Sequence, residues 1–523
     1  MADARSRLLR SAGSMAAMTL LSRLTGYVRD FLQAVILGAA DSSDAFIIAY
    51  RIPNLLRRLV GEGAMTASFV PVFTEIEGRS ARQELWRFAS LALTTLAAVL
   101  AVMSALGIAF APWIVKGMAY GFTDVPGKLE LTTTLTRVMF PYLFFIGLSA
   151  LQMAILNAVG SFALPAFTPV LLNLSIIAAA VGVAGRLTEP AYAFAWGVLA
   201  GGLLQMVVQI PSLRRSGLRL TSGTGFSHPG IRRVLQLMIP GTFGAGIYQI
   251  NLLIDSQFAS FLPTGSPSYL YYANRITELV LGVFVVSIST AILPALSRDV
   301  QRDSGGGARD TLDFGLRQTA LVTLPACAGL LALSEPIVRV LFERGRFDAA
   351  STRFTAEALV YYSLGLVPIA ALRVILPAFY ARQDTRTPVW IAFWTMALHI
   401  ALNVILVWVI PMEHRGIALS TSLCSLFNLV ALAWIHARRW GSPWGRSTNI
   451  AIFRCTLASA LMAVGCRLAL WGLSFDDRIA FTQVLVLMMV IIGGTFAYLA
   501  LLWGLGAPEP RELLAALKRA RRA

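Results

Sequence analysis

Ionisable side chains recur through an otherwise apolar stretch near the start of the chain, from Ser22 to Glu77. An ionisable group near the centre of a bilayer costs roughly 2.5–3.5 kcal/mol, so these groups are expected to face water, one another or a ligand. Only Arg58 and Glu62 stand at the four-residue spacing of a helical pair. The remaining excess of arginine predicts a site for an anion. Eight of these ionisable residues, five of them arginines, are Arg23, Arg29, Asp30, Asp44, Arg51, Arg57, Arg58 and Glu62.

The composition places this stretch in a membrane protein. Of 523 residues, 57% are hydrophobic and 14% are charged, and the mean hydropathy is +0.69. Soluble proteins have a charged fraction of about 25%. Windows of about 20 apolar residues predict an all-α polytopic protein with about 14 transmembrane helices. Their centres fall near residues 22, 55, 102, 145, 173, 201, 248, 283, 325, 367, 398, 424, 460 and 492.

The formal net charge of +17 follows from topology rather than from nucleic-acid binding. Lys and Arg gather in the even-numbered connections and in both tails, including Arg214, Arg215 and Lys518. Positive residues favour the cytoplasmic side of a membrane. We therefore predict a multi-pass protein with both termini in the cytoplasm, and no nucleic-acid partner.

The residue patterns of common catalytic sites do not occur in the sequence. No phosphate-binding loop, nucleophile elbow or cluster of metal ligands is present, and the four cysteines stand singly. The sequence predicts a carrier without cofactor or metal, driven by the membrane potential, an ion gradient or the gradient of its substrate. Asp255, inside the seventh predicted helix, is a candidate ligand for a monovalent cation or a proton. A salt bridge to an arginine is an equal alternative.

The chain repeats itself after about 224 residues. The segment AYRI, with Arg51, aligns with ANRI, with Arg275, and Pro71 aligns with Pro294. Each copy holds six predicted helices, so both copies share one membrane orientation, and carriers of this kind bind substrate between their halves. We predict an N-terminal lobe at 1–215, a C-terminal lobe at 216–440, and two extra helices with a basic tail at 441–523.

Four segments resemble a known family. They are SRLTGYVRD, DAFIIAYRIPNLLRRLVGEGA with the following FVPVF, YYANRITEL, and FYARQDTRTP. They are similar to the signature segments of the MurJ/MviN lipid II flippases, in the multidrug/oligosaccharidyl-lipid/polysaccharide exporter superfamily. The resemblance implies a V-shaped carrier of two six-helix lobes, with two C-terminal helices that accommodate the lipid tail. It implies a monomer in the bacterial cytoplasmic (inner) membrane that moves lipid II to the outer leaflet for cell-wall synthesis. Membrane lipids and cell-wall synthesis proteins are further expected partners.

The resemblance also implies functional residues. Its substrate-binding arginines fall on Arg23, Arg29, Arg57 and Arg275, and its functional acid falls on Asp44. Three further positions, Glu62, Ser268 and Glu278, match residues near the family's cavity. Arg51 stands where some members have Lys.

A pyrophosphate carries about two negative charges, and the planar guanidinium of arginine suits bidentate phosphate recognition. Arg29, Arg57 and Arg275 are therefore predicted to clamp the pyrophosphate of the substrate. The acids Asp30, Asp44 and Glu278 are predicted to pair with the arginines when the outer gate is closed. The alternatives are a polysaccharide-lipid flippase, a drug antiporter, an intramembrane enzyme that acts on lipid pyrophosphates, and a scaffold for the cell-wall machinery.

Overall fold

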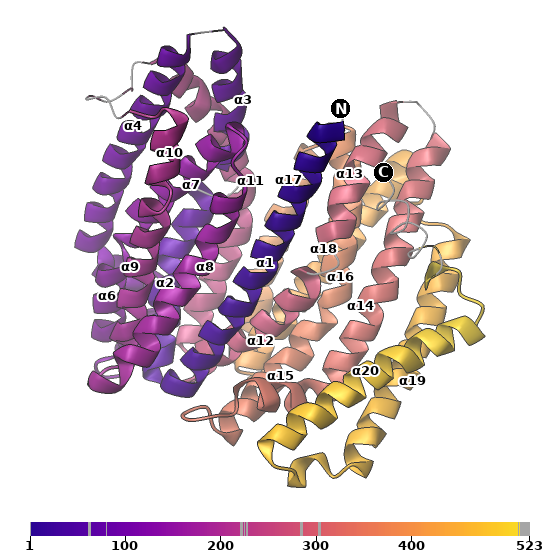
Figure 1. Cartoon of the computed structure of the whole chain (residues 1–523). Coiled ribbons are helices and arrows are strands. Elements are labelled where there is room, and N and C mark those ends of the chain that lie inside the picture. The colour runs from indigo at the N-terminus through magenta and orange to yellow at the C-terminus, as the bar shows by residue number, and fades with distance from the viewer. Residues whose placement is uncertain are drawn as a thin grey trace. The chain divides into compact units, whose positions relative to one another are not determined.

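The computed structural model describes the backbone at residues 2–60, 64–79, 81–219, 223, 225, 228–282, 286–301, 305–510 and 512. Side chains are described in these ranges except at 2–16, 56–60, 64, 66–67, 239–248, 286–291, 305–306 and 477. Within the described ranges the regular elements are helices (Figure 1). The predicted all-α class is confirmed.

Ten described helical segments are long and apolar enough to cross a membrane. They coincide with the predicted helices 3–6 and 9–14, which confirms a multi-pass membrane protein. The other four predictions fall on α1, on α2 and α3, on α11, and on α12 and α13, so the total of 14 stays a prediction. The ten segments are Arg82–Ala109, Lys128–Ala158, Ala163–Arg186, Ala191–Ser216, Gly307–Phe342, Ala349–Ala381, Arg386–Val409, His414–Trp440, Arg446–Gly472 and Ala480–Gly504.

The chain forms two compact units. The first contains Met1–Ser268 and Arg344–Phe347, and the second contains Tyr269–Glu343 and Asp348–Ala523. The predicted lobe boundaries are not tested by this division. The first unit holds α1 (Ala2–Leu37), α2 (Asp41–Val60), α3 (Ala64–Arg79), α4 (Arg82–Ala109), α5 (Ala111–Met118), α6 (Lys128–Met139), α7 (Tyr142–Ala158), α8 (Ala163–Gly182), α9 (Ala191–Val207), α10 (Ile210–Ser216) and α11 (Pro229–Ser260).

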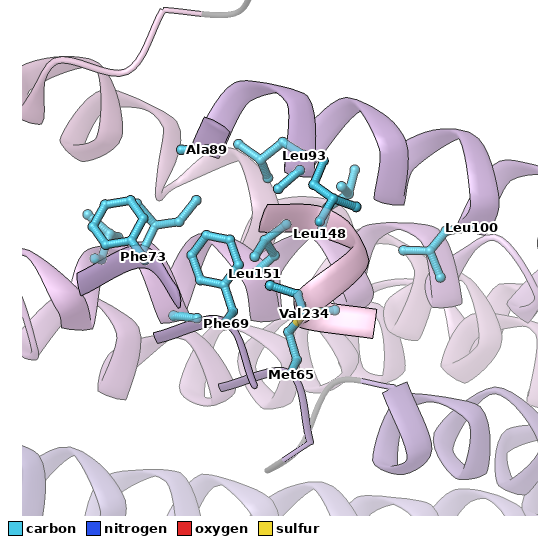
Figure 2. Packing of buried hydrophobic residues seen from close by; sticks show 14 of the residues in the cluster. Met65, Phe69, Phe73, Ala89, Leu93, Leu100, Leu148, Leu151 and Val234 are labelled. Atoms are coloured by element: carbon cyan, nitrogen blue, oxygen red, sulfur yellow. The ribbon is translucent and has the colours of Figure 1, made fainter. Parts of the chain in front are cut away.

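The core of the first unit is built by α3, α4, α7 and α11 (Figure 2). Helix α3 places Met65, Phe69 and Phe73 four residues apart, on one face of the helix, and all three are buried. The ring of Phe69 stacks on that of Phe88 from α4, with centroids 5.4 Å apart. Leu151 of α7 belongs to the same buried cluster. The cluster fixes α3 in place although the helix contains Pro71.

Helix α1 is long, and its two ends mark opposite ends of the first unit. Its 36 residues rise 1.5 Å each, so it is about 54 Å long. A turn at Gly38, with φ of +66°, leads into α2, and a Cβ there would lie 2.6 Å from the carbonyl oxygen of Arg346. This close approach in a left-handed conformation requires glycine. The start of α2 therefore lies at the end of α1 that is far from Ala2.

The second unit is organised on α14 (Gly305–Phe342), against which α19 (Arg446–Gly472) and α20 (Ala480–Gly504) pack (Figure 1). Asp313 of α14 accepts hydrogen bonds from the Gly445 N–H at 2.7 Å and from the Thr448 hydroxyl at 2.6 Å. The Asp313 carboxylate lies at the N-terminus of α19. It therefore accepts from donors that have no acceptor within the helix. The other helices are α12 (Ser266–Val280), which enters the second unit at Tyr269, α13 (Val286–Gln301), α15 (Ala349–Leu364), α16 (Leu366–Ala381), α17 (Arg386–Val404) and α18 (His414–Trp440).

Candidate functional site

A buried lysine joins two helices of the first unit. Lys128 begins α6, and its side chain is 3% exposed. The Lys128 Nζ lies 2.8 Å from Oδ1 of Asp41 and 2.8 Å from Oδ2 of Asp44, both in the first turn of α2. It also lies 4.4 Å from the centroid of the Phe122 ring. A buried cation is stable only when it is paired in this way.

Asp44 in turn holds the start of α12. Its carboxylate accepts hydrogen bonds from the Gly265 N–H at 2.8 Å, from the Ser268 N–H at 3.1 Å and from the Ser268 hydroxyl at 2.6 Å. With Lys128 it has four donors, which fills the capacity of an ionised carboxylate. The dipole of α12 adds attraction, because the N-terminus of a helix is partly positive. We call Asp41, Asp44, Lys128, Thr264, Gly265 and Ser268 the Asp44 network.

The expectation that Asp44 pairs with an arginine is wrong. Its cationic partner in the structure is Lys128, which is 84 residues away in the sequence. The packing of α6 on α2 brings the two together. The sequence analysis missed Lys128 because it falls in a predicted connection, where a lysine is ordinarily solvated. The pair could have been considered from the sequence, because both Asp44 and Lys128 are predicted to lie on the outer side of the membrane.

Arg29 lies against α8. Its Nε and Nη2 donate to Oδ1 of Asp30 at 3.0 and 2.7 Å, and its Nη1 donates to Oδ1 of Asn173 at 3.0 Å. Asp30 therefore contacts an arginine that is adjacent in the same helix, and its role in an outer gate stays a prediction. Asn173 is a polar residue that the sequence analysis missed, although an amide inside an apolar span was a signal for it. It also donates to the backbone oxygen of Ser22, which fixes its orientation.

Arg275 lies in the second unit, in α12. Its Nη1 is 3.1 Å from Oε2 of Glu278, and its Nη2 donates to the Tyr271 hydroxyl at 3.2 Å. The guanidinium also stands over the Tyr271 ring, 5.1 Å from its centroid. Glu278 therefore contacts an arginine of the same helix, and its role in an outer gate stays a prediction. The Arg275 side chain is 31% exposed.

The remaining predicted residues are placed as follows. Arg23 is half-buried in α1, and Asp255 is half-buried in α11. The side chain of Arg57 and the whole of Glu62 lie outside the described residues. Arg51 donates to the Ser256 hydroxyl of α11. The substrate, gate and cation roles of these residues stay predictions. Within the described ranges, no group of three or more His, Cys, Asp or Glu residues is placed to hold a metal ion.

Comparison with known proteins decides the family. The family model described as "Lipid II flippase MurJ" matches residues 33–491. The chain belongs to this family. It is 37% identical over 514 residues to the lipid II flippase MurJ of Burkholderia cenocepacia, covering 95% of this chain and 98% of the relative. It is also 37% identical over 521 residues to the probable lipid II flippase MurJ of Vibrio cholerae, covering 96% of each chain.

Solved structures agree with the assignment to the MurJ family. The structure titled "Lipid II flippase MurJ, inward closed conformation" matches with a TM-score of 0.77 and 26% identity, over 96% of this chain and 99% of that chain. An inward-facing multidrug resistance MATE transporter matches with a TM-score of 0.67 but only 14% identity, over 82% of this chain and 98% of that chain. The second match shows a shared fold alone.

Proposed function

We propose that this chain is a lipid II flippase of peptidoglycan synthesis. It moves the undecaprenyl-pyrophosphate-linked precursor from the cytoplasmic to the outer leaflet by alternating access. The observation that carries the proposal is the 37% identity, over 95% of the chain, to a relative named for this function. The match to a solved MurJ structure at a TM-score of 0.77 adds the same fold over nearly the whole length.

The proposed architecture is two parallel six-helix repeats followed by α19 and α20. Four charged helical regions would join the ten apolar spans, to give fourteen. The spacing of the described helices supports the repeat, because corresponding helices start about 224 residues apart. The pairs are α2 with α12, α7 with α16, α8 with α17, and α9 with α18.

The proposed substrate site uses Arg23, Arg29, Arg57 and Arg275 to bind the pyrophosphate, with Glu62 near the cavity. Arg29 and Arg275 already have carboxylate partners in the structure. Substrate phosphate oxygens would compete with these carboxylates for the same guanidinium groups. Binding of substrate would therefore release the acids, which biases the carrier toward a different state.

The Asp44 network is proposed as part of the outer gate. If both termini are cytoplasmic, the network lies on the outer side, because α1 runs its full length between Ala2 and the start of α2. Opening that side would then separate Asp44 from Gly265 and Ser268. The membrane potential, at about 2.3 kcal/mol per charge per 100 mV, would draw the anionic substrate outward and the emptied, positive cavity inward.

We further propose a monomer in the bacterial cytoplasmic membrane that performs no covalent chemistry and requires no cofactor. Lipid II and membrane lipids are its partners, and cell-wall synthesis proteins are candidate partners. A monovalent cation at Asp255 is an alternative to the membrane potential as a source of energy.

Depletion of the protein in cells provides the test of the function. Lipid II should then accumulate in the cytoplasmic leaflet, as measured by an enzyme that reaches only the outer leaflet. Unchanged access of that enzyme to lipid II would contradict the proposal. Release of phosphate from lipid II by the purified protein would instead indicate an enzyme.

A further inference from the structure

A pocket in the first unit shares no lining residue with the Asp44 network or with the predicted substrate-binding arginines. Its volume is about 590 Å³, within the range of small-molecule sites. Helices α4, α7, α9 and α10 supply its walls. Most of the lining is apolar, and includes Leu93, Phe144, Leu148, Met206 and Ile210. Leu93 and Leu148 are close together in the view of Figure 2, at the edge of the core.

The pocket opens where membrane lipid is expected. It is formed by three of the ten candidate spans, Arg82–Ala109, Lys128–Ala158 and Ala191–Ser216. Beside it, Leu203, Leu204 and Val207 of α9 are 42%, 43% and 44% exposed. Exposed aliphatic side chains on a membrane span face the hydrocarbon of the bilayer. An apolar pocket at this place is accessible to an acyl chain.

Two arginines lie at one end of the pocket. Arg214 stands in the last turn of α10, and Arg219 follows Gly217, which turns the chain with φ of +115°. Both side chains are exposed, and neither forms an ion pair with a carboxylate of the described residues. The pocket wall therefore combines an apolar slot with two arginines that no carboxylate of the described residues neutralises.

A buried amide adds a third feature. Gln152 of α7 lines the pocket, is 6% exposed, and its Oε1 has no hydrogen-bond partner among the described residues. A buried polar atom without a partner is costly. This oxygen needs a donor, and water bound at the linkage between the headgroup and the chains of a lipid supplies one, since the ester oxygens themselves only accept.

The charged end of the pocket lies at the end of the unit opposite Lys128. Lys128 begins the span that ends at Ala158, and Ala158 lines a second pocket together with Ser216, at the end of α10. Under the proposed orientation this end is cytoplasmic. The cytoplasmic leaflet presents anionic headgroups that attract basic residues near the surface.

We propose that the pocket holds one acyl chain of an anionic phospholipid, with the lipid phosphate between Arg214 and Arg219. The volume is of the order that one acyl chain fills, which favours a phospholipid over the long polyprenyl tail of the transported precursor. The bound lipid packs α4 against α7 and α9. It is a structural ligand of the first unit and is not transported.

Native mass spectrometry of the purified protein, with phosphatidylglycerol or phosphatidylcholine added, tests the proposal. Wild type should bind phosphatidylglycerol more tightly than phosphatidylcholine. The double variant Arg214→Gln, Arg219→Gln should lose roughly thirtyfold of that affinity, since each basic residue near an anionic headgroup contributes about fivefold. Arg215→Gln is the matched control, because Arg215 is exposed on the same helix but does not line the pocket, and it should bind as wild type does.

A pocket-filling variant separates the chain from the charge. Ala97→Phe adds a ring inside the pocket, and should abolish binding of both lipids while the protein still melts cooperatively. Equal affinity for the two lipids, or unchanged binding by the double variant or by Ala97→Phe, overturns the proposal. Displacement of phosphatidylglycerol by undecaprenyl phosphate would assign the pocket to the substrate tail and also overturn it. These measurements do not depend on transport, so the lipid-binding proposal can fail without contradicting the flippase function, and the reverse.

Discussion

The ammonium of Lys128 lies 2.8 Å from the carboxylate of Asp44, and both side chains are buried, at 3% and 0% exposure. Removing one member of such a pair leaves an uncompensated buried charge, at a cost of about 3–5 kcal/mol. We expect Lys128→Met to lower the melting temperature clearly. Combining it with Asp44→Asn should restore part of the loss, because no unpaired charge is then buried and the single amide oxygen can still accept from the Ser268 N–H and hydroxyl.

Thermal unfolding of the four proteins in a double-mutant cycle measures this coupling. Lys116→Met is the control, since Lys116 is exposed on the nearby α5. If the melting temperature of Lys128→Met equals that of Lys116→Met, the pair of Lys128 and Asp44 does not stabilise the fold.

The gate can be followed at Asp41 and Thr264, whose side chains are 2.8 Å apart. Cysteines at both positions, in a chain whose four native cysteines are replaced, should crosslink while leaving Asp44 intact. We expect more crosslinking in energised cells than after collapse of the potential, because the potential returns the empty, positive cavity to the inward side. Single-cysteine variants are the control. A yield that is unchanged by dissipation, at matched expression, would rule out this coupling.

The arginine clamp predicts loss of transport without loss of protein. Arg29→Ala, Arg57→Ala and Arg275→Ala should each fail to complement depletion at normal abundance. The corresponding lysine variants should retain partial function, since the charge remains but the bidentate fork is lost. Arg137→Ala, at an exposed position of α6, should complement. Full complementation by two of the three alanine variants would refute the clamp.

Asp255→Asn tests the coupling ion. If Asp255 binds sodium or a proton, transport by the variant should no longer respond to sodium or pH, because the amide cannot be ionised. A transport assay in proteoliposomes with imposed gradients measures this response. Wild-type responses in the variant would leave a structural salt bridge as the role of Asp255.

Asp384 lies in the connection between α16 and α17, and we expect its ionisation to make the stability of the protein depend on pH. Partial burial opposes ionisation, but the Thr387 N–H and hydroxyl and the Arg439 guanidinium outweigh it and hold the pKa of Asp384 below its usual value. A depressed folded-state pKa gives stability that is complete above the unfolded pKa of about 4 and is lost as the pH falls through the lower folded value.

Asp384→Asn keeps an oxygen that can accept from Thr387 but loses the ion pair with Arg439. It should therefore reduce stability at pH 7 by about 0.2–1 kcal/mol, the usual contribution of a solvent-exposed pair. The difference from wild type should shrink in the acidic range. Melting temperatures at pH 7 and about pH 3 measure both effects, with the exposed Asp124→Asn as the control. A difference that does not vary with pH would contradict the assignment.

The sequence by itself determined the membrane class and ten of the spans. A long apolar run can satisfy its backbone in lipid only as a helix, so hydropathy is sufficient there. It also assigned arginine partners to Asp30 and Glu278 without naming them. In the structure these partners are close in sequence, Arg29 beside Asp30 and Arg275 three residues before Glu278. The three-residue spacing places two side chains on one helix face, whereas adjacent positions do not face each other, so the first contact depends on the length of the arginine side chain.

The tertiary structure decided the partners that lie far apart in the chain. Asp44 with Lys128 and Arg29 with Asn173 are separated by 84 and 144 residues, and only the packing of α6 on α2 and of α8 on α1 brings them into contact. The lipid pocket likewise depends on gaps between side chains of four helices. Hydropathy cannot specify these, because it records how apolar a residue is and not which neighbour it meets.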